Sequence, residues 1–133
     1  ARRALKPNGL FCAWCYSLLE ISAAVDAIIH RLYYETLAGC WPAGRSSVDA
    51  GYRDIQPPFP RIEPPPFALE AHWDLRELMG YLRTWSAVKQ WQQRHGRDPI
   101  TSIEPQLTSA WGQAGQRRLI RWPLHFLTGF PNR

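Results

Sequence analysis

The chain lacks any Gly-x-Gly pair among its nine glycines. Loops that bring backbone amides against a pyrophosphate need closely spaced glycines, because side chains would block the approach. We therefore expect no self-contained site of the usual kind for a dinucleotide or for ATP. The sequence also contains no His-Glu-x-x-His and no Gly-x-Ser-x-Gly motif, so it gives no sign of a zinc protease or a serine hydrolase.

Long apolar runs are absent as well. No stretch of about 18 apolar residues occurs, and the chain does not open with the charged, apolar and small-residue pattern of a signal peptide. The three cysteines are an odd number, which argues against a disulfide framework. These absences predict a cytoplasmic protein without a membrane segment.

Metal ligands are few and scattered. Cys12 and Cys15 form a Cys-x-x-Cys motif, but residues three apart in a strand point to opposite faces, and a zinc site needs further ligands. We interpret both cysteines as small apolar fillers of a buried strand and predict no metal. The histidines have no carboxylate or thiol at ligand spacing, which leaves catalytic or metal roles unsupported for His30, His72, His95 and His125.

The formal charge of +5 would suit an anionic partner such as nucleic acid. Most arginines occur singly, and only Arg117, Arg118 and Arg121 cluster. Scattered single charges are typical of a solvated surface, so we predict no nucleic-acid partner. A basic nucleic-acid-binding module stays open as an alternative that would need a contiguous arginine face and steep salt dependence.

What the chain does contain is enough apolar material for one core. Its 133 residues are 45% hydrophobic, which predicts a single domain over residues 1–133. Seven Trp, five Tyr and five Phe either fill that core or line a pocket for a flat or apolar ligand. Composition leaves both uses of the aromatic residues open.

The first half of the chain reads as strand, helix and linker. Residues 1–5 resemble the last turn of a helix, which suggests a truncated chain or gene, and residues 10–16 follow a turn as a buried strand. Apolar residues at helical spacing predict a helix over residues 22–38, ended by Gly39. Six prolines between residues 56 and 67 predict an extended, stiff linker.

The second half returns to regular structure. Alternation over residues 67–73 predicts a strand, and Asp74 with Glu77 forms a capping signal for a helix whose apolar stripe runs to Val88, with Gly96 placed to stop it. Pro105 predicts a short turn from Pro99 and a fresh helix starting at residue 105. A last strand over residues 118–130 completes an α/β pattern, and Pro123 within it calls for a bulge or an unpaired position.

One segment carries a family resemblance. The run Arg3-Ala4-Leu5-Lys6-Pro7-Asn8-Gly9-Leu10 before an apolar strand resembles the phrase that leads into the fifth strand of class I S-adenosylmethionine-dependent methyltransferases. Asn8 stands where that phrase usually has glycine, and Asn also tolerates left-handed backbone. Further matches follow in the same order, among them Cys40-Trp41-Pro42, Gly51-Tyr52-Arg53, Pro58-Phe59-Pro60, Gly80-Tyr81-Leu82-Arg83-Thr84-Trp85-Ser86, Ala110-Trp111-Gly112 and Trp122-Pro123-Leu124.

The resemblance implies the C-terminal half of such an enzyme, in a subgroup similar to trans-aconitate methyltransferases. It implies a partial Rossmann-like fold in which a three-stranded antiparallel sheet, with the last strand central, packs with about four helices. The glycine-rich loop and the ribose-binding acid of the family are missing, so we expect no cofactor-binding residue and no bound S-adenosylmethionine in this chain alone.

The functional expectation follows from the resemblance. The chain would form the acceptor-substrate side of a methyltransferase that acts on a small molecule, with Tyr16, Tyr81 and Trp85 lining the acceptor wall or serving as core aromatics. The alternative is a noncatalytic binding or structural protein derived from a truncated methyltransferase gene. In the parent fold another strand pairs with residues 10–16, so we expect a homodimer through that exposed edge; pairing through the helix of residues 25–37 is the alternative.

Overall fold

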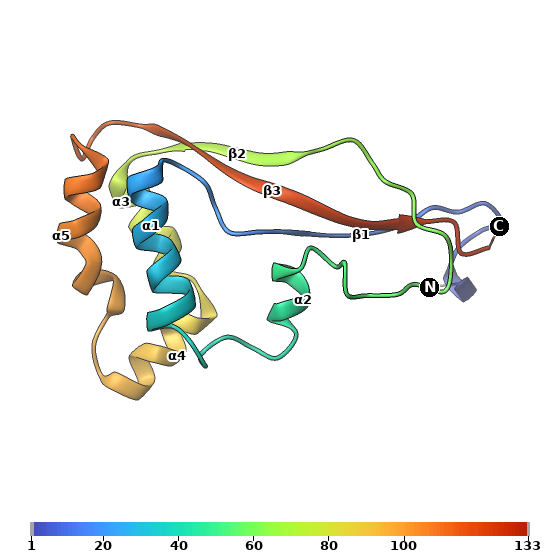
Figure 1. Ribbon diagram of the computed structural model, residues 1–133, viewed down its shortest axis with the longest axis horizontal. Helices are drawn as coiled ribbons and strands as arrows, with labels where there is room; N and C mark the ends of the chain where they lie inside the picture. The colour runs from blue at the N-terminus through green and yellow to red at the C-terminus, as the bar shows by residue number, and fades with distance from the viewer. Residues whose placement is uncertain (1, 133) are drawn as a thin grey trace. The chain divides into compact units, whose positions relative to one another are not determined.

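The computed structural model describes residues 2–132, which form a mixed α/β fold of three strands and five α-helices (Figure 1). A 3₁₀ turn at Arg2–Ala4 and a π-helical turn at Leu32–Thr36 add to these elements. The strands are β1 (Phe11–Tyr16), β2 (Ala68–Trp73) and β3 (Arg118–Gly129). The helices are α1 (Ala23–Arg31), α2 (Arg45–Asp49), α3 (Leu75–Arg83), α4 (Ser86–His95) and α5 (Pro99–Trp111).

The chain divides into two compact units. Unit 1 comprises Ala1–Leu18, Gly44–Leu69 and Trp122–Arg133, and unit 2 comprises Leu19–Ala43 and Glu70–Arg121. The expectation of one domain stays a prediction.

The strand order is β1-β3-β2, which confirms the three-stranded antiparallel sheet with the last strand in the centre.

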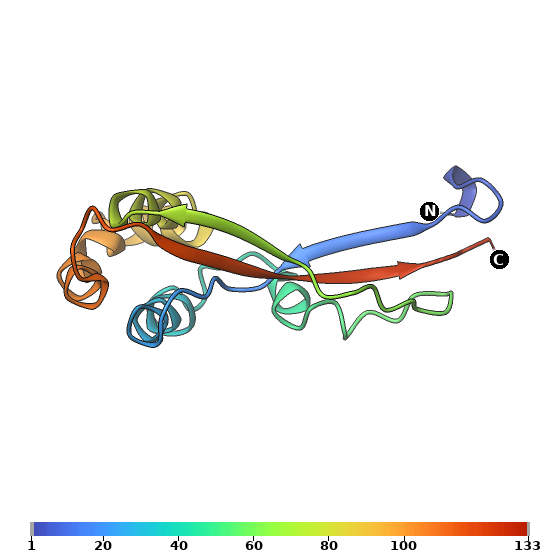
Figure 2. The same cartoon turned by 90° about the horizontal axis from the view of Figure 1, so that it is seen from above.

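Unit 1 is organised by the ladder between β1 and β3. The two strands run antiparallel with a register from Phe11 opposite Gly129 to Tyr16 opposite Leu124, and their arrows point in opposite directions in Figure 2. Pro123 lies directly beyond the last pair of this ladder, where its carbonyl accepts a bond from the Ser17 amide at 3.0 Å. Proline therefore removes no donor from the ladder with β1.

The proline-rich segment of residues 56–67 contains no helix and no strand, and its role as a linker stays a prediction. The linker is fastened to β3 at two points. The Ile62 amide donates to the Thr128 carbonyl at 2.9 Å while the Thr128 hydroxyl donates to the Ile62 carbonyl at 2.8 Å. The Leu124 amide donates to the Phe67 carbonyl at 3.0 Å. Prolines lack an amide hydrogen, so the few non-proline residues and the carbonyls carry this pairing.

β1 is not buried throughout, which corrects the sequence-based expectation. Cys15 is buried, whereas Trp14 and Tyr16 are 53% and 38% exposed. Cys12 is exposed, so the two cysteines lie on opposite faces as predicted, but only Cys15 fills a buried position. Within residues 2–132 no three His, Cys, Asp or Glu side chains gather as metal ligands.

Unit 2 gathers α1, α3, α4 and α5 beside one another (Figure 1). Ser22 caps α1, since its hydroxyl accepts a hydrogen bond from the Val25 amide. The helix continues into the π-helical turn, and Gly39 then takes a left-handed φ of 73°. This confirms a helical segment over residues 22–38. The fully buried side chains of this unit include Leu19, Val25, Ile29, Leu32, Leu37, Leu78, Leu82, Ile100, Leu107, Trp111 and Ile120.

The predicted long helix after Asp74 is two helices. The chain leaves helical geometry at Trp85, which has ψ 132° and acts as the residue before α4. The Thr84 hydroxyl donates to the Tyr81 carbonyl at 2.6 Å and so replaces helical bonding there. The apolar stripe runs across the break because α3 and α4 each bury one face, so the spacing alone did not reveal two helices.

The predicted break at Pro105 is also wrong, because α5 runs without interruption from Pro99 to Trp111. A proline inside a helix removes one backbone bond and costs about 3 kcal/mol. Ile100 before it and Leu107 and Trp111 after it are all fully buried. An unbroken helix allows these three side chains to be buried together, and the free energy gained by burial offsets the cost of the proline.

The sequence analysis predicted no helix for residues 40–55, where the structure has the short α2.

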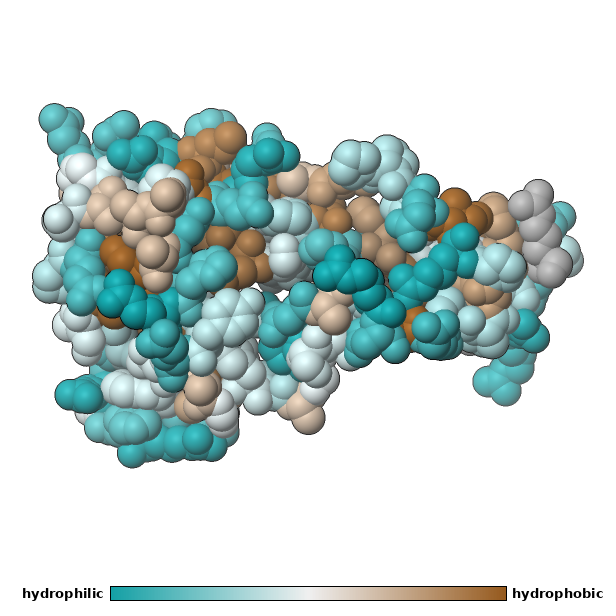
Figure 3. All heavy atoms as spheres, viewed as in Figure 1, coloured by the Kyte–Doolittle hydropathy of each residue, from teal (hydrophilic) through white to brown (hydrophobic). Residues whose placement is uncertain are grey.

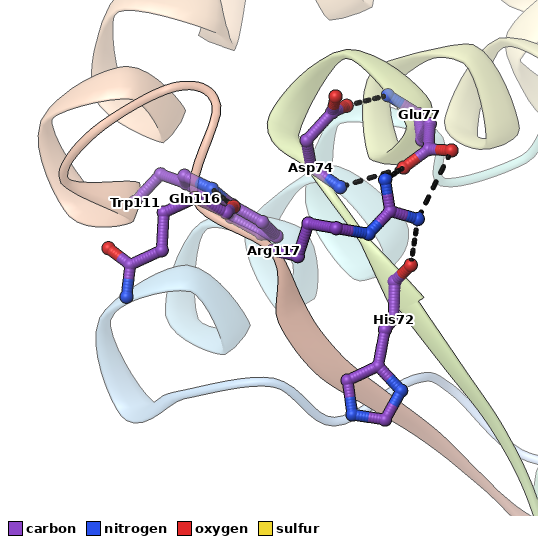
Figure 4. A network of polar contacts seen from close by, with 6 residues as sticks. All are labelled: His72, Asp74, Glu77, Trp111, Gln116 and Arg117. Carbon is purple, nitrogen blue, oxygen red and sulfur yellow. Dashed lines mark hydrogen bonds and ion pairs between the residues drawn. The ribbon is translucent and has the colours of Figure 1, made fainter.

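The start of α3 is fixed by a capping box and an arginine. Asp74 accepts the Glu77 amide and Glu77 accepts the Asp74 amide, both at 2.9 Å, as predicted. Figure 4 shows the Arg117 guanidinium reaching both the Glu77 carboxylate, 3.2 Å away, and the His72 carbonyl. Arg117, in the turn before β3, therefore ties the end of β2 to the first turn of α3.

Asp98 caps α5 and supplies a pH-dependent contribution to stability. Its partial burial alone would raise the pKa, but hydrogen bonds from Arg83, the Ile100 amide and Thr101 outweigh burial and lower it. A carboxyl group with a lowered folded pKa stabilises the fold above its unfolded pKa and loses that contribution as pH falls through the folded value.

We therefore expect Asp98→Asn to lower the free energy of unfolding by about 1 kcal/mol at pH 7, an N-cap-sized effect, since Asn still caps but cannot pair with Arg83. The difference between the two proteins should shrink as pH falls below about 4. Urea titrations at pH 7 and pH 3 measure both values. A gap that stays constant between these pH values would contradict the role of the carboxylate.

Hydrophobic and hydrophilic residues are mixed on the face of the molecule drawn in Figure 3, where hydrophobic residues reach the surface in several places. In the described part of the chain, no helix combines the length and apolar character needed to cross a membrane. The exposed large hydrophobic residues include Leu10, Trp14, Tyr16, Tyr34, Ile55, Ile62, Phe67, Leu69 and Leu119.

Candidate functional site

Tyr16, the first predicted site residue, ends β1 in unit 1. It pairs with Leu124 of β3, and its ring is 38% exposed. The strand places successive side chains on opposite faces, so Tyr16 lies on the same face as Trp14 and opposite to Cys15. The exposed ring is accessible to a ligand, and its role in lining the acceptor wall stays a prediction.

The other face of β1 carries Cys15, which packs against the turn after α2. Burial raises the pKa of the Cys15 thiol, and the hydrogen bond from Tyr52 and the charge of Arg45 lower it by less. Burial also raises the pKa of Tyr52. The thiol therefore stays protonated and is a poor nucleophile near neutral pH. The pair acts as a packing contact that holds the turn against β1.

Tyr81 and Trp85, the other two predicted site residues, lie together in unit 2. Their ring centroids are 5.9 Å apart in an edge-to-face arrangement. Trp85 also stands edge-on to Tyr33 at 5.7 Å and lies 5.5 Å from Trp41, while Tyr81 lies 5.3 Å from Trp73. Tyr33 is buried and the other four rings are half-buried.

This aromatic cluster is well packed and partly accessible. Edge-to-face and tilted ring pairs stabilise by about 0.5–1.5 kcal/mol beyond the burial of their area. The Trp41 indole donates to the Tyr33 carbonyl at 3.0 Å, which fixes one ring firmly. Trp85 serves the core of unit 2 through these contacts, and its half-buried edge remains available to a ligand. The cluster can therefore both fill the core of unit 2 and line a ligand site, the two uses that composition left open.

A cavity of about 330 Å³ in unit 1 was missed by sequence reasoning. Arg53, Arg61, Glu63 and His125 line it, together with Gly51 and a run of prolines. Three of these charged residues stand singly in an irregular segment, and His125 is one of four isolated histidines, so no spacing rule joined them. The fold assembles them because the loop of residues 51–66 returns along β3.

The comparisons with known proteins bear on the whole chain. No protein-family model matches it. A protein of Dictyostelium discoideum that carries the provisional name of a methyltransferase is 28% identical over 124 residues, which cover 90% of this chain and 47% of that protein. A solved structure from Anaeromyxobacter dehalogenans, described provisionally as a type II methyltransferase, is 39% identical over 98% of this chain and 55% of that chain, with a TM-score of 0.91.

The chain is similar to methyltransferases. The methyltransferase part of the resemblance read from the sequence is thereby supported, and the fold matches that of the structural neighbour over nearly the whole chain. The chain spans about half the length of the two relatives.

The described residues do not fit a methyl-donor site of the kind that the resemblance implies. No Gly-x-Gly pair is present to bring backbone amides against the cofactor. The left-handed glycines that could make a close approach, Gly39, Gly44, Gly51, Gly96 and Gly112, lie in separate turns. Unit 1 offers an exposed tyrosine and a cationic cavity, and unit 2 offers an aromatic cluster.

Proposed function

We propose that this chain is the C-terminal, acceptor-substrate side of an S-adenosylmethionine-dependent methyltransferase that acts on a small molecule in the cytoplasm, and that it is not active alone. The observation that carries the proposal is the 39% identity and TM-score of 0.91 over 98% of the chain to a protein described as a methyltransferase. The strand order with β3 between β1 and β2, expected from the resemblance, adds support.

A chimera tests this proposal. The 55% of the Anaeromyxobacter dehalogenans protein that matches this chain would be replaced by the 133 residues, and binding of S-adenosylmethionine would be measured by calorimetry in parent and chimera. We expect a folded chimera that binds the cofactor within about threefold of the parent, because under this proposal the exchanged part makes no contact with the cofactor. A folded chimera that binds at least a hundredfold more weakly, or a parent that does not bind, would refute the proposal.

The isolated chain should not bind S-adenosylmethionine measurably, because it has no glycine-rich loop to receive the cofactor. We expect the dissociation constant to be weaker than about 100 μM, which corresponds to roughly 5.5 kcal/mol of binding free energy. Isothermal titration with S-adenosylmethionine measures it directly. Tighter binding would reveal a complete site within these residues and would overturn the inactivity of the chain on its own.

We propose that Tyr16, Tyr81 and Trp85 contact the acceptor molecule. Tyr16 is a candidate because its ring, at the end of β1, is exposed. Tyr81 and Trp85 are candidates because they form the partly accessible edge of the aromatic cluster. In the active chimera, Tyr16→Phe and Tyr81→Phe keep the rings and remove only the hydroxyls, so they should raise KM for the acceptor and leave the cofactor affinity unchanged. Equal loss of both affinities would point to a structural role.

The second candidate function is a noncatalytic binding or structural protein derived from a methyltransferase. The observation that favours it is the chain's lack of a methyl-donor site of the expected kind. A chimera with full cofactor binding but no transfer of a labelled methyl group to any cellular small-molecule extract would support this alternative. Methyl transfer in the chimera would exclude it.

We propose self-association through the free edge of β1. Among residues 2–132, β1 pairs with β3 alone, and its neighbour Leu10 and its own Trp14 are 52% and 53% exposed. An open edge with apolar side chains favours pairing with a second strand, and two copies can pair about a twofold axis.

The prediction is a homodimer at micromolar concentration that Trp14→Lys and Ala13→Pro weaken. Lysine places a charge on the edge and proline removes an amide donor from β1. Sedimentation equilibrium measures the dissociation constant, with Arg76→Lys on α3 as the control that should leave it unchanged. A stable monomer at about 100 μM would refute the dimer, and a dimer indifferent to both edge substitutions would point to α1 instead.

A further inference from the structure

The cavity of unit 1 carries an excess of positive charge. Two guanidinium groups, Arg53 and Arg61, and one carboxylate, Glu63, leave a net charge of +1 on its wall with His125 neutral. Within residues 2–132 neither Arg53 nor Glu63 takes part in an ion pair. A cavity wall with an excess of one sign of charge attracts ligands of the opposite sign.

Arg61 is held in place with donors to spare. Its Nη2 donates to the backbone carbonyls of Tyr52 and Ile55, each at 2.5 Å. A guanidinium has five N–H donors, and among the described residues only these two bonds engage Arg61. Its Nε and Nη1 hydrogens therefore remain for a ligand, on a side chain that the two carbonyls have already oriented.

The turn that carries Arg53 is fixed by an uncommon backbone. Tyr52 has a φ of 61°, a left-handed value that is costly for a bulky side chain. Its amide donates to the Ser47 carbonyl at 2.9 Å, its carbonyl accepts from Arg61, and its hydroxyl hydrogen-bonds to Cys15. These three contacts hold the conformation and keep Arg53 at the cavity.

His125 is brought to the cavity by a glycine. A Cβ on Gly51 would lie 2.8 Å from His125 Nδ1, so only glycine, here with a φ of 59°, allows the imidazole this close to the turn. His125 comes from β3 and Arg53 from the turn that follows Gly51, so strand and loop both contribute. An imidazole beside two guanidinium groups can donate a further hydrogen bond to a ligand oxygen.

We propose that this cavity binds a small molecule through an oxyanion, a carboxylate or a phosphate, gripped by Arg53 and by the Nε and Nη1 donors of Arg61, with His125 beside it. Guanidinium groups match the planar geometry of such oxyanions and form the strong, charge-assisted bonds that hold them. Glu63 limits the total negative charge that the cavity accepts. The inference stands apart from the proposed function, because it requires neither S-adenosylmethionine nor methyl transfer.

Calorimetry on the 133-residue chain tests the site with three probes: succinate, inorganic phosphate, and succinamide as the uncharged match to succinate. We expect at least one of the two anions to bind and succinamide not to bind. Succinate alone would identify a carboxylate site and phosphate alone a phosphate site. Failure of both anions to bind at about 10 mM, or equal binding of succinamide, would overturn the proposal.

Variants locate the binding. Arg53→Gln should weaken the bound anion about tenfold, and Glu63→Gln should tighten it about threefold, because each changes one charge at the cavity wall. Arg61→Lys keeps the charge and loses the paired geometry, so it should weaken binding by a similar factor of about ten. Arg76→Gln, an exposed arginine on α3 in unit 2, is the matched control and should leave the affinity unchanged.

Circular dichroism checks the folding of each variant. If Arg61→Lys disturbs the loop, the affinity of the folded Arg53→Gln variant still tests the proposal. Arginine Nε and histidine side-chain resonances give an independent readout, because a bound oxyanion should shift the signals of Arg53, Arg61 and His125 and leave that of Arg76 in place. An affinity that is the same in wild type, Arg53→Gln and Glu63→Gln would show that the anion binds elsewhere and would overturn the assignment.

Discussion

Replacing Trp111 with alanine should lower the free energy of unfolding by about 3–5 kcal/mol. Trp111 ends α5 with no exposed surface, and it is the largest fully buried side chain of the described chain. Its indole donates to the Gln116 carbonyl at 2.9 Å, and the Arg118 guanidinium lies 5.6 Å from the ring centroid. The substitution would remove a large apolar surface, open a cavity and leave the Gln116 carbonyl without this donor.

Urea denaturation followed by far-ultraviolet circular dichroism measures this loss. Trp111→Phe keeps most of the volume and loses the indole donor, so we expect a smaller cost of about 1–2 kcal/mol. Trp14→Ala removes an indole of the same size from an exposed position. Measured at a concentration where the chain is monomeric, it should change stability by less than about 0.5 kcal/mol. Similar losses for Trp111→Ala and Trp14→Ala would contradict the packing described for unit 2.

Gly129→Ala should destabilise unit 1 by about 3 kcal/mol through overpacking. A Cβ on Gly129 would lie 2.5 Å from both the Phe59 ring and the Pro60 carbonyl oxygen. The ring of Phe59 also packs edge-on against Phe11 at 5.6 Å, so it has little room to retreat. The proline-rich linker can approach β3 this closely only because residue 129 has no side chain.

Gly80→Ala is the matched control for this substitution. Gly80 lies inside α3, and a Cβ there would meet no atom within 4 Å. Alanine has the higher helix propensity, so this change should stabilise the protein by about 0.5–1 kcal/mol. Urea titrations of both variants give the comparison. A Gly129→Ala protein as stable as wild type would mean that the linker does not pack on β3 as described.

A double-mutant cycle isolates the contact. If Phe59 is the obstacle, Gly129→Ala should cost less in a Phe59→Ala background than in wild type, by about 1 kcal/mol or more. The Pro60 carbonyl stays in place and accounts for the cost that remains. Independent, additive losses would assign the effect of Gly129→Ala to the backbone rather than to the aromatic ring.

The sequence was informative where a few neighbouring residues decide the structure. Asp74 and Glu77 form the capping box of α3, and Gly39 takes the left-handed conformation, both as predicted. Such features depend on hydrogen bonds between residues at most four apart, so they can be read from spacing. The strand order followed instead from the resemblance to a family, because no local pattern specifies which strands pair.

The candidate site divides in the same way. Tyr81 and Trp85 lie four residues apart around the end of α3, so their proximity was within reach of helical spacing. Arg53, Arg61 and His125 lie at unrelated positions, and the charge pattern around them looked like ordinary surface. Only the return of the proline-rich linker along β3 brings them to one cavity.

Local signals in the sequence were enough for the start of α3, for the glycine that follows the first helical segment, and for the lack of a glycine-rich phosphate loop. Three features depend on packing between distant parts of the chain: α5 continues through Pro105, Trp85 separates α3 from α4, and Trp14 of β1 stays exposed. The free energies involved explain why. A proline or a backbone turn costs a few kcal/mol, and burying several large side chains together changes the free energy by as much or more, so packing over long sequence distances overrides the local preference.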